Sequence, residues 1–371
     1  MRAAINKIKR TFYLSILLLL YAATSSNAWQ TSSEVPGEQP SAAEVKELHR
    51  DDVVHFTLPG PDSVGSKIKC GLNGDIFAAY SISSSSEYWK NPIRRVSPSS
   101  KQITEFPIPT IATFKDLSRL SFDTDSNGVL YALFQARLSS ESPRRFAYLI
   151  VKYKDTGDVD SFIQLQDPIH RQIQPATLSV FASGNFLVSG TVRDTSAPEG
   201  TISVFSAVYS PSGMYRAPVV ADISTPANVV ASQDPIAVAS SLLSVSSSDG
   251  NIYILQGNRL KTVSHTGTVE RERITAAPEK DLTALQIAQA GAGSIFVFYD
   301  YVSSGVAAEN AKRRGMINII NTQTGEITQT YRLSQAEPDF AVASCAASLN
   351  DFVFLSSDQK DQLQVINYRY K

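Results

Sequence analysis

A pattern of strand, tight turn and strand recurs along this chain and constrains its fold more than any single residue does. Six copies follow one another at intervals of roughly fifty-odd residues. Their turns are Asn73-Gly74, Asn127-Gly128, Gly184-Asn185, Asp249-Gly250, Gly293-Ser294 and Asn350-Asp351, and each leads into a short apolar run. Repetition at this interval predicts a fold assembled from copies of one supersecondary unit, each burying its faces against its neighbours.

A second hairpin follows the first in most copies. Its turns are Thr156-Gly157, Ser212-Gly213, Thr266-Gly267 and Thr324-Gly325. Glycine suits such turns because they require positive φ, which a side chain resists. Two hairpins give four strands per copy, and this content and period are typical of β-propellers. We therefore predict an all-β fold, a six-bladed β-propeller of four-stranded antiparallel blades.

The last copy offers only three strands, near residues 341–347, 352–356 and 363–369. A strand-like segment at 53–59, ahead of the first full copy, is similar to the outer-strand segment at 103–109. We expect this N-terminal strand to complete the C-terminal blade and close the ring, which removes an open edge.

The first residues are typical of an export signal. Basic residues precede an apolar run at 12–23, and Ser26-Asn27-Ala28 forms a small-residue cleavage site. The run is shorter than the roughly 20 residues that span a bilayer, although a retained anchor is the alternative. We predict a signal peptide at 1–28, a flexible lead-in at 29–50, in which residues 42–50 could form a short helix, and the propeller at 51–371. The expected product is periplasmic or secreted, without a stable membrane span.

Charge bears on the class of partner. The whole chain has 34 basic and 35 acidic residues, and the predicted leader carries Arg2, Lys7, Lys9 and Arg10 but no acid. Its removal leaves an acidic protein, which disfavours nucleic-acid binding.

In its strand and turn spacing the chain resembles six-bladed propellers of the TolB-like and NHL-like type over about residues 51–371. The resemblance implies a fold and a binding face. It implies no single activity, because such propellers include scaffolds, ligand binders, lactonases and lyases.

Two cysteines, Cys70 and Cys345, fall on the predicted inner strands of the first and last blades, which a closed ring makes neighbours. An exported protein can keep a disulfide, so one interpretation is a bond that locks the ring. The alternative is two buried free thiols that pack as small apolar residues.

Long loops join the second to the third strands and one blade to the next, and we place any site on that face. Candidate binding residues are Tyr88, Trp89, Arg94, Arg144, His170, Arg313 and Arg314. Guanidinium groups bind carboxylates and phosphates, and exposed aromatic rings occur in recognition surfaces. The alternatives are ion pairs between blades, aromatic caps over a blade core and a solvated loop histidine.

Catalytic and metal motifs are weak. The segment Asp123 to Gly128 matches the start of a calcium-binding loop, but Phe134 stands where the bidentate Glu belongs, so an Asx-rich hairpin turn explains it. No G-x-S-x-G elbow occurs. Asp123, Asp281 and Asp339 are inner-strand candidates for a metal-assisted hydrolase, and no cofactor is predicted.

The sequence favours a non-catalytic propeller that binds a protein or a small acidic or carbohydrate ligand. The alternative function is a metal-assisted hydrolase, lactonase or lyase with its site at the mouth of the channel. Three or more acidic or amide side chains converging there would favour the enzyme.

Overall fold

A computed structural model gives the fold. It describes residues 44–57, 62–82, 91–138, 146–166, 172–193, 202–219, 243–256, 259–275, 277–279, 282–301, 315–334, 341–357 and 362–371. Residues 43–371 belong to one unit. Within the described ranges, no helix has the length and apolar character needed to cross a bilayer.

Strands dominate the described residues, and they pair with their sequence neighbours as antiparallel hairpins. The separate four-stranded sheets are β2 (Asp62–Cys70), β3 (Ile76–Ile82), β4 (Ile93–Ser97), β5 (Gln102–Phe106); β6 (Phe114–Thr124), β7 (Leu130–Leu138), β8 (Phe146–Tyr153), β9 (Val159–Gln164); β10 (Gln172–Val180), β11 (Phe186–Arg193), β12 (Ile202–Tyr209), β13 (Tyr215–Pro218); and β14 (Leu243–Ser246), β15 (Ile252–Gln256), β16 (Arg259–Val263), β17 (Val269–Ile274).

The remaining strands form one eight-stranded sheet. It contains β18 (Leu282–Gln289), β19 (Ser294–Tyr301), β20 (Met316–Asn321), β21 (Ile327–Leu333), β1 (Val45–Thr57), β24 (Gln362–Arg369), β23 (Asp351–Ser357) and β22 (Ala341–Ala346), in that spatial order. A single 3₁₀ turn, η1 (Leu72–Gly74), follows β2.

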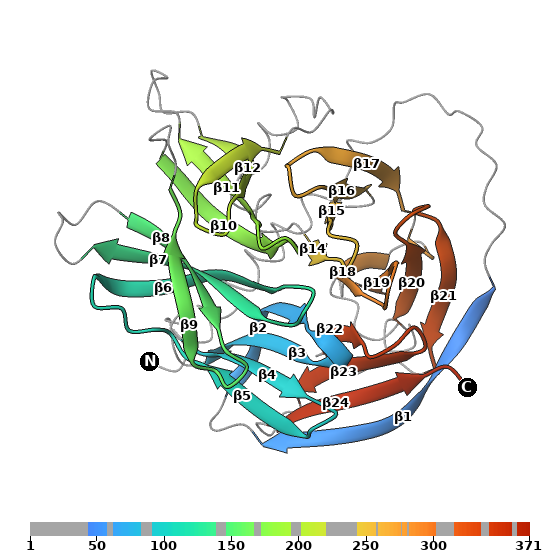
Figure 1. Ribbon diagram of the computed structural model, residues 1–371. Helices are drawn as coiled ribbons and strands as arrows, with labels where there is room; N and C mark the ends of the chain where they lie inside the picture. The colour runs from blue at the N-terminus through green and yellow to red at the C-terminus, as the bar shows by residue number, and fades with distance from the viewer. Residues whose placement is uncertain are drawn as a thin grey trace, which may run out of the picture. The chain divides into compact units, whose positions relative to one another are not determined.

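The sheets are arranged as the blades of a propeller, as Figure 1 shows. The first strand of each unit contacts the first strand of the next, in the closed cycle β2, β6, β10, β14, β18, β22 and back to β2. This cycle passes through six inner strands. The hydrogen-bonded sheets number five, because β1 joins the last two four-stranded units into the eight-stranded sheet. The all-β class and the propeller of four-stranded antiparallel sheets are confirmed.

Strand β1 closes the ring, as predicted, and it also pairs with a second sheet unit, which was not predicted. Residues His49–Thr57 pair antiparallel with β24 and complete the last sheet. Residues Val45–Leu48 pair parallel with β21 of the neighbouring half. Strand β1 therefore begins inside the range expected to be a flexible lead-in, and the short helix considered for residues 42–50 is wrong. The physical reason is Leu48, which is fully buried against Tyr331 and Leu333.

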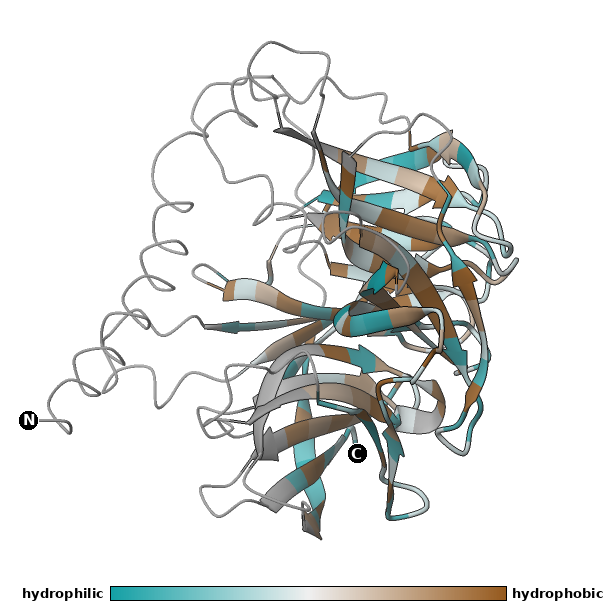
Figure 2. Cartoon of the chain, turned by 90° about the vertical axis from the view of Figure 1, so that its left-hand side faces the viewer, coloured by the Kyte–Doolittle hydropathy of each residue, from teal (hydrophilic) through white to brown (hydrophobic). Residues whose placement is uncertain are grey.

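The hydrophobic core lies between successive sheets. Buried apolar residues occupy long runs of the strands, and Figure 2 colours the apolar residues of the sheets brown. In the cluster between the first two sheets, Phe106 of β5 meets Tyr153 of β8 edge to face, with ring centroids 5.7 Å apart. Such packing fixes the position of each sheet against the next.

The glycines of the third-to-fourth strand turns also allow close contact with a neighbouring sheet, which the sequence alone did not predict. Each has positive φ, as expected. A Cβ atom at Gly157 would overlap the carbonyl oxygen of Glu105 in β5, and one at Gly213 would overlap that of Gln164 at the end of β9. These turns therefore rest directly on the outer strand of the preceding sheet, and only glycine permits that approach.

We expect Gly213→Ala to destabilise the protein more than Gly250→Ala. Both residues have positive φ, so each substitution costs about 1–2 kcal/mol of backbone strain. Nothing lies within 4 Å of a Cβ atom at Gly250, whereas at Gly213 the overlap adds about 1–3 kcal/mol. Chemical denaturation of both variants measures the difference. Equal losses would show that the turn does not bear on the neighbouring sheet.

Candidate functional site

The only predicted binding residue on the long-loop face that the structure describes is Arg94, in β4. It is buried, and its Nε donates to Glu105 Oε1 at 2.8 Å. The adjacent Arg95 pairs with Asp155 of the next sheet. Arg95 therefore pairs between two sheets, whereas Arg94 pairs within its own sheet, and its role in binding stays a prediction. Outside the described residues lie Tyr88, Trp89, Arg144, His170, Arg313, Arg314, Asp281 and Asp339.

A cavity of about 200 Å³ opens where the inner strands end. Its walls come from β2, β6, β14, β18 and β22 and from the residues just beyond them. These ends lead into the tight first-to-second strand turns. The cavity thus lies at the end of the channel opposite to the long-loop face on which the sequence placed a site.

Lys69 reaches across the channel at this cavity. It stands one residue before the end of β2, and its Nζ donates to the carbonyl oxygen of Ser244 in β14 at 2.6 Å. The same ammonium lies 3.3 Å from Ser244 Oγ and 3.4 Å from Asp123 Oδ1. Its three donors all point at protein oxygens, so Lys69 ties together strands of three sheets.

Asp123 lies on β6 beside the cavity and is only 2% exposed. Besides Lys69, it accepts a hydrogen bond from the backbone N–H of Val180 at 3.1 Å through Oδ2. Two residues earlier, Ser121 Oγ accepts from the backbone N–H of Leu178 at 3.1 Å, so one face of β6 satisfies the free edge of β10. Burial raises the pKa of the Asp123 carboxyl, against the lowering effect of Lys69.

Hydroxyl groups continue this polar network. Ser179 Oγ and Ser244 Oγ share a hydrogen bond of 2.7 Å, and Ser246 Oγ donates to the Val180 carbonyl oxygen. Thr124 Oγ1 donates to the carbonyl oxygen of Cys70 at 3.0 Å. Part of the cavity wall is therefore an internally bonded network of the Lys69 ammonium, the Asp123 carboxylate and several hydroxyls.

The calcium-loop segment forms a hairpin turn. Asp125 Oδ1 accepts from the backbone N–H groups of Asn127 and Val129, both at 2.9 Å. This is the Asx turn that the sequence predicted for the segment. In the described part of the chain, no three His, Cys, Asp or Glu side chains are grouped so as to hold a metal ion.

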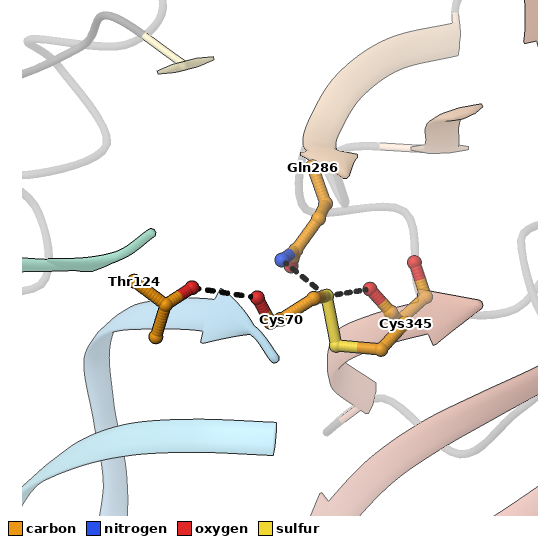
Figure 3. The surroundings of a disulfide bond; sticks show 5 residues. Cys70, Thr124, Gln286 and Cys345 are labelled. Carbon is orange, nitrogen blue, oxygen red and sulfur yellow. Dashed lines mark hydrogen bonds between the residues drawn. A yellow bond between two sulfur atoms is a disulfide. The ribbon is translucent and has the colours of Figure 1, made fainter. Parts of the chain in front are cut away.

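Cys70 and Cys345 form a disulfide at the cavity, with their Cα atoms 5.4 Å apart. Figure 3 shows the bond between the ends of β2 and β22, with Gln286 of β18 beside it. Gln286 Nε2 donates to Cys70 Sγ at 3.5 Å. The bond thus connects the first and last inner strands of the cycle.

Lys69, Ser244 and Ser246 were not predicted, and Asp123 was named only as a possible metal ligand. The sequence feature that could have identified them is a polar residue within the last few positions of an inner strand. One sequence does not distinguish such residues from ordinary exposed strand positions, because the contact partners come from other sheets.

Comparisons with known proteins give only distant similarities. No protein-family model matches the sequence, and no curated protein matches it either. Solved structures are similar at low identity. One is a protein of unknown function from Dyadobacter fermentans, with 9% identity, TM-score 0.47, 87% of this chain and 99% of that chain covered.

Two further similar structures carry functional names. A luciferin-regenerating enzyme has 11% identity and TM-score 0.46, covering 86% of this chain and 95% of its own. The calcium-binding protein regucalcin from Agrobacterium tumefaciens has 12% identity and TM-score 0.43, covering 88% and 98%. At these values the likeness assigns no activity, and the TolB-like or NHL-like type stays a prediction.

Proposed function

We propose that this protein is an exported binding protein that takes a small polar ligand into the cavity at the tight-turn end of its channel, without chemistry of its own. The observation that carries the proposal is that the lysine and the buried aspartate at the cavity are both already bound to other groups of the protein. Lys69 and Asp123 bind each other and main-chain groups, so each is engaged in holding the wall. A general base needs an oxygen within reach of the substrate, which this pairing withholds.

The chemistry of the wall favours a neutral ligand that carries hydroxyl groups, as carbohydrates do. Lys69 and Asp123 cancel in charge, and Asp125 at the cavity adds a carboxylate that would repel an acidic ligand. Gln289 supplies an amide that can donate and accept hydrogen bonds. The hydroxyls of Thr124 and Ser246 donate to main-chain carbonyl oxygens and can still accept a hydrogen bond from a ligand. Of the ligand classes expected from the sequence, the carbohydrate type fits this wall better than the acidic one.

The volume of the cavity limits the size of the ligand. Pockets for drug-sized molecules measure about 300–1,000 Å³, and this cavity measures about 200 Å³. A ligand the size of a single sugar ring or smaller suits that volume, whereas a chain of several rings would extend into solvent.

Gln289→Ala tests the cavity. Gln289 lines it from β18, is half-buried, and its Nε2 has a weak contact, 3.4 Å, with the Gly291 carbonyl oxygen. We expect wild-type protein to show a raised melting temperature with at least one small polyol or monosaccharide, and the variant to lose most of that rise. Gln323→Ala is the matched control, because Gln323 is exposed in a turn outside the cavity. An equal loss in both variants would remove the cavity as the binding site.

A second function is favoured by two observations. Asp123, Asp125 and Gln289 all line the cavity, and such a group of acidic and amide side chains is the feature expected of an enzyme at the channel mouth. Asp123 is a buried carboxyl with a raised pKa beside a lysine, which is a pattern that enzymes use for acid–base chemistry. A channel-centred hydrolase or lyase would need Lys69 to move away and free the carboxyl. Release of acid from ester or lactone probes by the wild-type protein, abolished in Asp123→Asn, would favour this function over simple binding.

A further inference from the structure

The Cys70–Cys345 bond forms part of the cavity wall. Cys70 lines the cavity, as do Gly71 and Leu72 after it, and Ala346 and Ala347, which follow Cys345 on the neighbouring strand, line it too. The bond therefore ties together two adjacent strands of the cavity wall. Strand β1 closes the ring independently, through β21 and β24 on the outer strands.

The two sulfur atoms differ in access. Cys345 is fully buried, whereas Cys70 is partly exposed and borders the cavity. Thiol–disulfide exchange begins when a thiolate attacks one of the two sulfurs, and access decides which one. A reductant small enough to enter the cavity therefore meets Cys70 Sγ first.

Groups around Cys70 suit a free thiol as well as a disulfide. Cys70 Sγ lies 3.1 Å from the carbonyl oxygen of Ser344, which could accept a hydrogen bond from a thiol but not from a disulfide sulfur. Gln286 Nε2 already donates to the same sulfur. The bond also packs against two hydrophobic clusters, so polar groups at Cys70 Sγ stand beside apolar packing. The Ser344 hydroxyl is fully buried and has no hydrogen-bond partner among the described residues.

We propose that Cys70 Sγ is a redox-modification site, where a small dithiol opens the disulfide and loosens the cavity wall while the propeller stays folded. A thiolate of the dithiol attacks Cys70 Sγ, the Cys70–Cys345 bond breaks, and Cys345 leaves as a thiolate that takes up a proton. The second thiol of the reductant then displaces the Cys70 thiol, and the dithiol departs as its own disulfide. Two electrons pass from the reductant to the protein.

Gln286 controls this reaction. In the view of Figure 3 its amide lies on the side of Cys70 Sγ away from Cys345, which is the side from which an in-line attack must come. Gln286 is 7% exposed and belongs to the strand that lines the cavity beside Ile287 and Ala288. Removing the amide should therefore speed the opening of the bond without altering the bond itself.

The test treats the folded protein with dithiothreitol and follows each thiol by differential alkylation and mass spectrometry. We expect intermediates trapped at early times to have the dithiol joined to Cys70 and the first free thiol on Cys345, and Gln286→Ala to speed the reaction several-fold. Hydrogen exchange should rise in residues 69–75 and 344–351 while β10 to β17 keep their protection. The double variant Cys70→Ser with Cys345→Ser should stay folded, show the same raised exchange and ignore the reductant.

Two results would overturn the proposal: thiols that appear only under conditions that unfold the protein, or thiols that appear together with a loss of protection throughout the propeller. These experiments are done without a cavity ligand, so their outcome does not depend on whether the binding proposal is correct. Only the expected consequence, weaker ligand binding after reduction, rests on the proposed function.

Discussion

Removal of residues 1–57 is expected to abolish the stable fold, although of the described strands it removes only β1 and leaves β2 to β24 in the chain. Strand β1 completes the last sheet and joins it to β21. Leu48 and Phe56 of β1 are buried, and together they contribute about 3–6 kcal/mol. Whole domains are stable by only about 5–15 kcal/mol, so this loss removes a large part of the margin before any β1 hydrogen bond is counted.

Removal of residues 1–42 is the matched control, because it ends where the unit Ala43–Lys371 begins and keeps β1. Thermal unfolding followed by circular dichroism compares the two truncations. The shorter one should melt like the full chain, and the longer one should lack a cooperative transition. Equal melting curves would show that β1 does not hold the ring closed.

Lys69→Met is expected to lower the free energy of unfolding by about 3–5 kcal/mol. It removes the cation and leaves Asp123 charged in a nearly dry site, with the exposed fractions of the two side chains 14% and 3%. The double variant Lys69→Met with Asp123→Asn should recover most of the loss, because a neutral amide can keep the Val180 hydrogen bond. Urea denaturation of the two single variants and the double variant measures this coupling.

The same pair predicts a dependence on pH. Because the Asp123 pKa in the folded protein is raised above its usual 3.8, the folded state binds a proton more readily than the unfolded chain. This contribution to stability is fully present below pH 3.8 and is lost as the pH rises through the folded pKa. The deficit of Lys69→Met should therefore shrink as the solution is acidified. A deficit that is constant with pH would mean that Lys69 acts through packing alone.

Local patterns in the sequence were sufficient for the fold. Hairpin turns at a regular interval and the short apolar runs beside them predicted four-stranded units, and the likeness of residues 53–59 to an outer strand predicted the closing role of β1. The strand at Val45–Leu48 was missed, because a short parallel pairing depends on a partner almost three hundred residues away and on the burial of Leu48.

The candidate site was less predictable for a related physical reason. Loop residues such as Arg94 look available in a sequence, but its guanidinium is used by Glu105 on the adjacent strand. Conversely, Lys69 and Asp123 look ordinary until the ring brings β2, β6 and β14 to one channel. Long-range contacts of this kind leave no spacing pattern in a single chain. Only the cysteine pair pointed to the same place, through the expected adjacency of the first and last blades.

The most direct test of the central claim is equilibrium dialysis of the protein against small neutral polyols and monosaccharides, with mass analysis of the ligand that is recovered. If the cavity binds without chemistry, the wild-type protein retains at least one compound, Gln289→Ala retains much less, and the compound is recovered unchanged. Recovery of a hydrolysed or dehydrated product, or no retention of any such compound by the wild-type protein, would contradict the proposal.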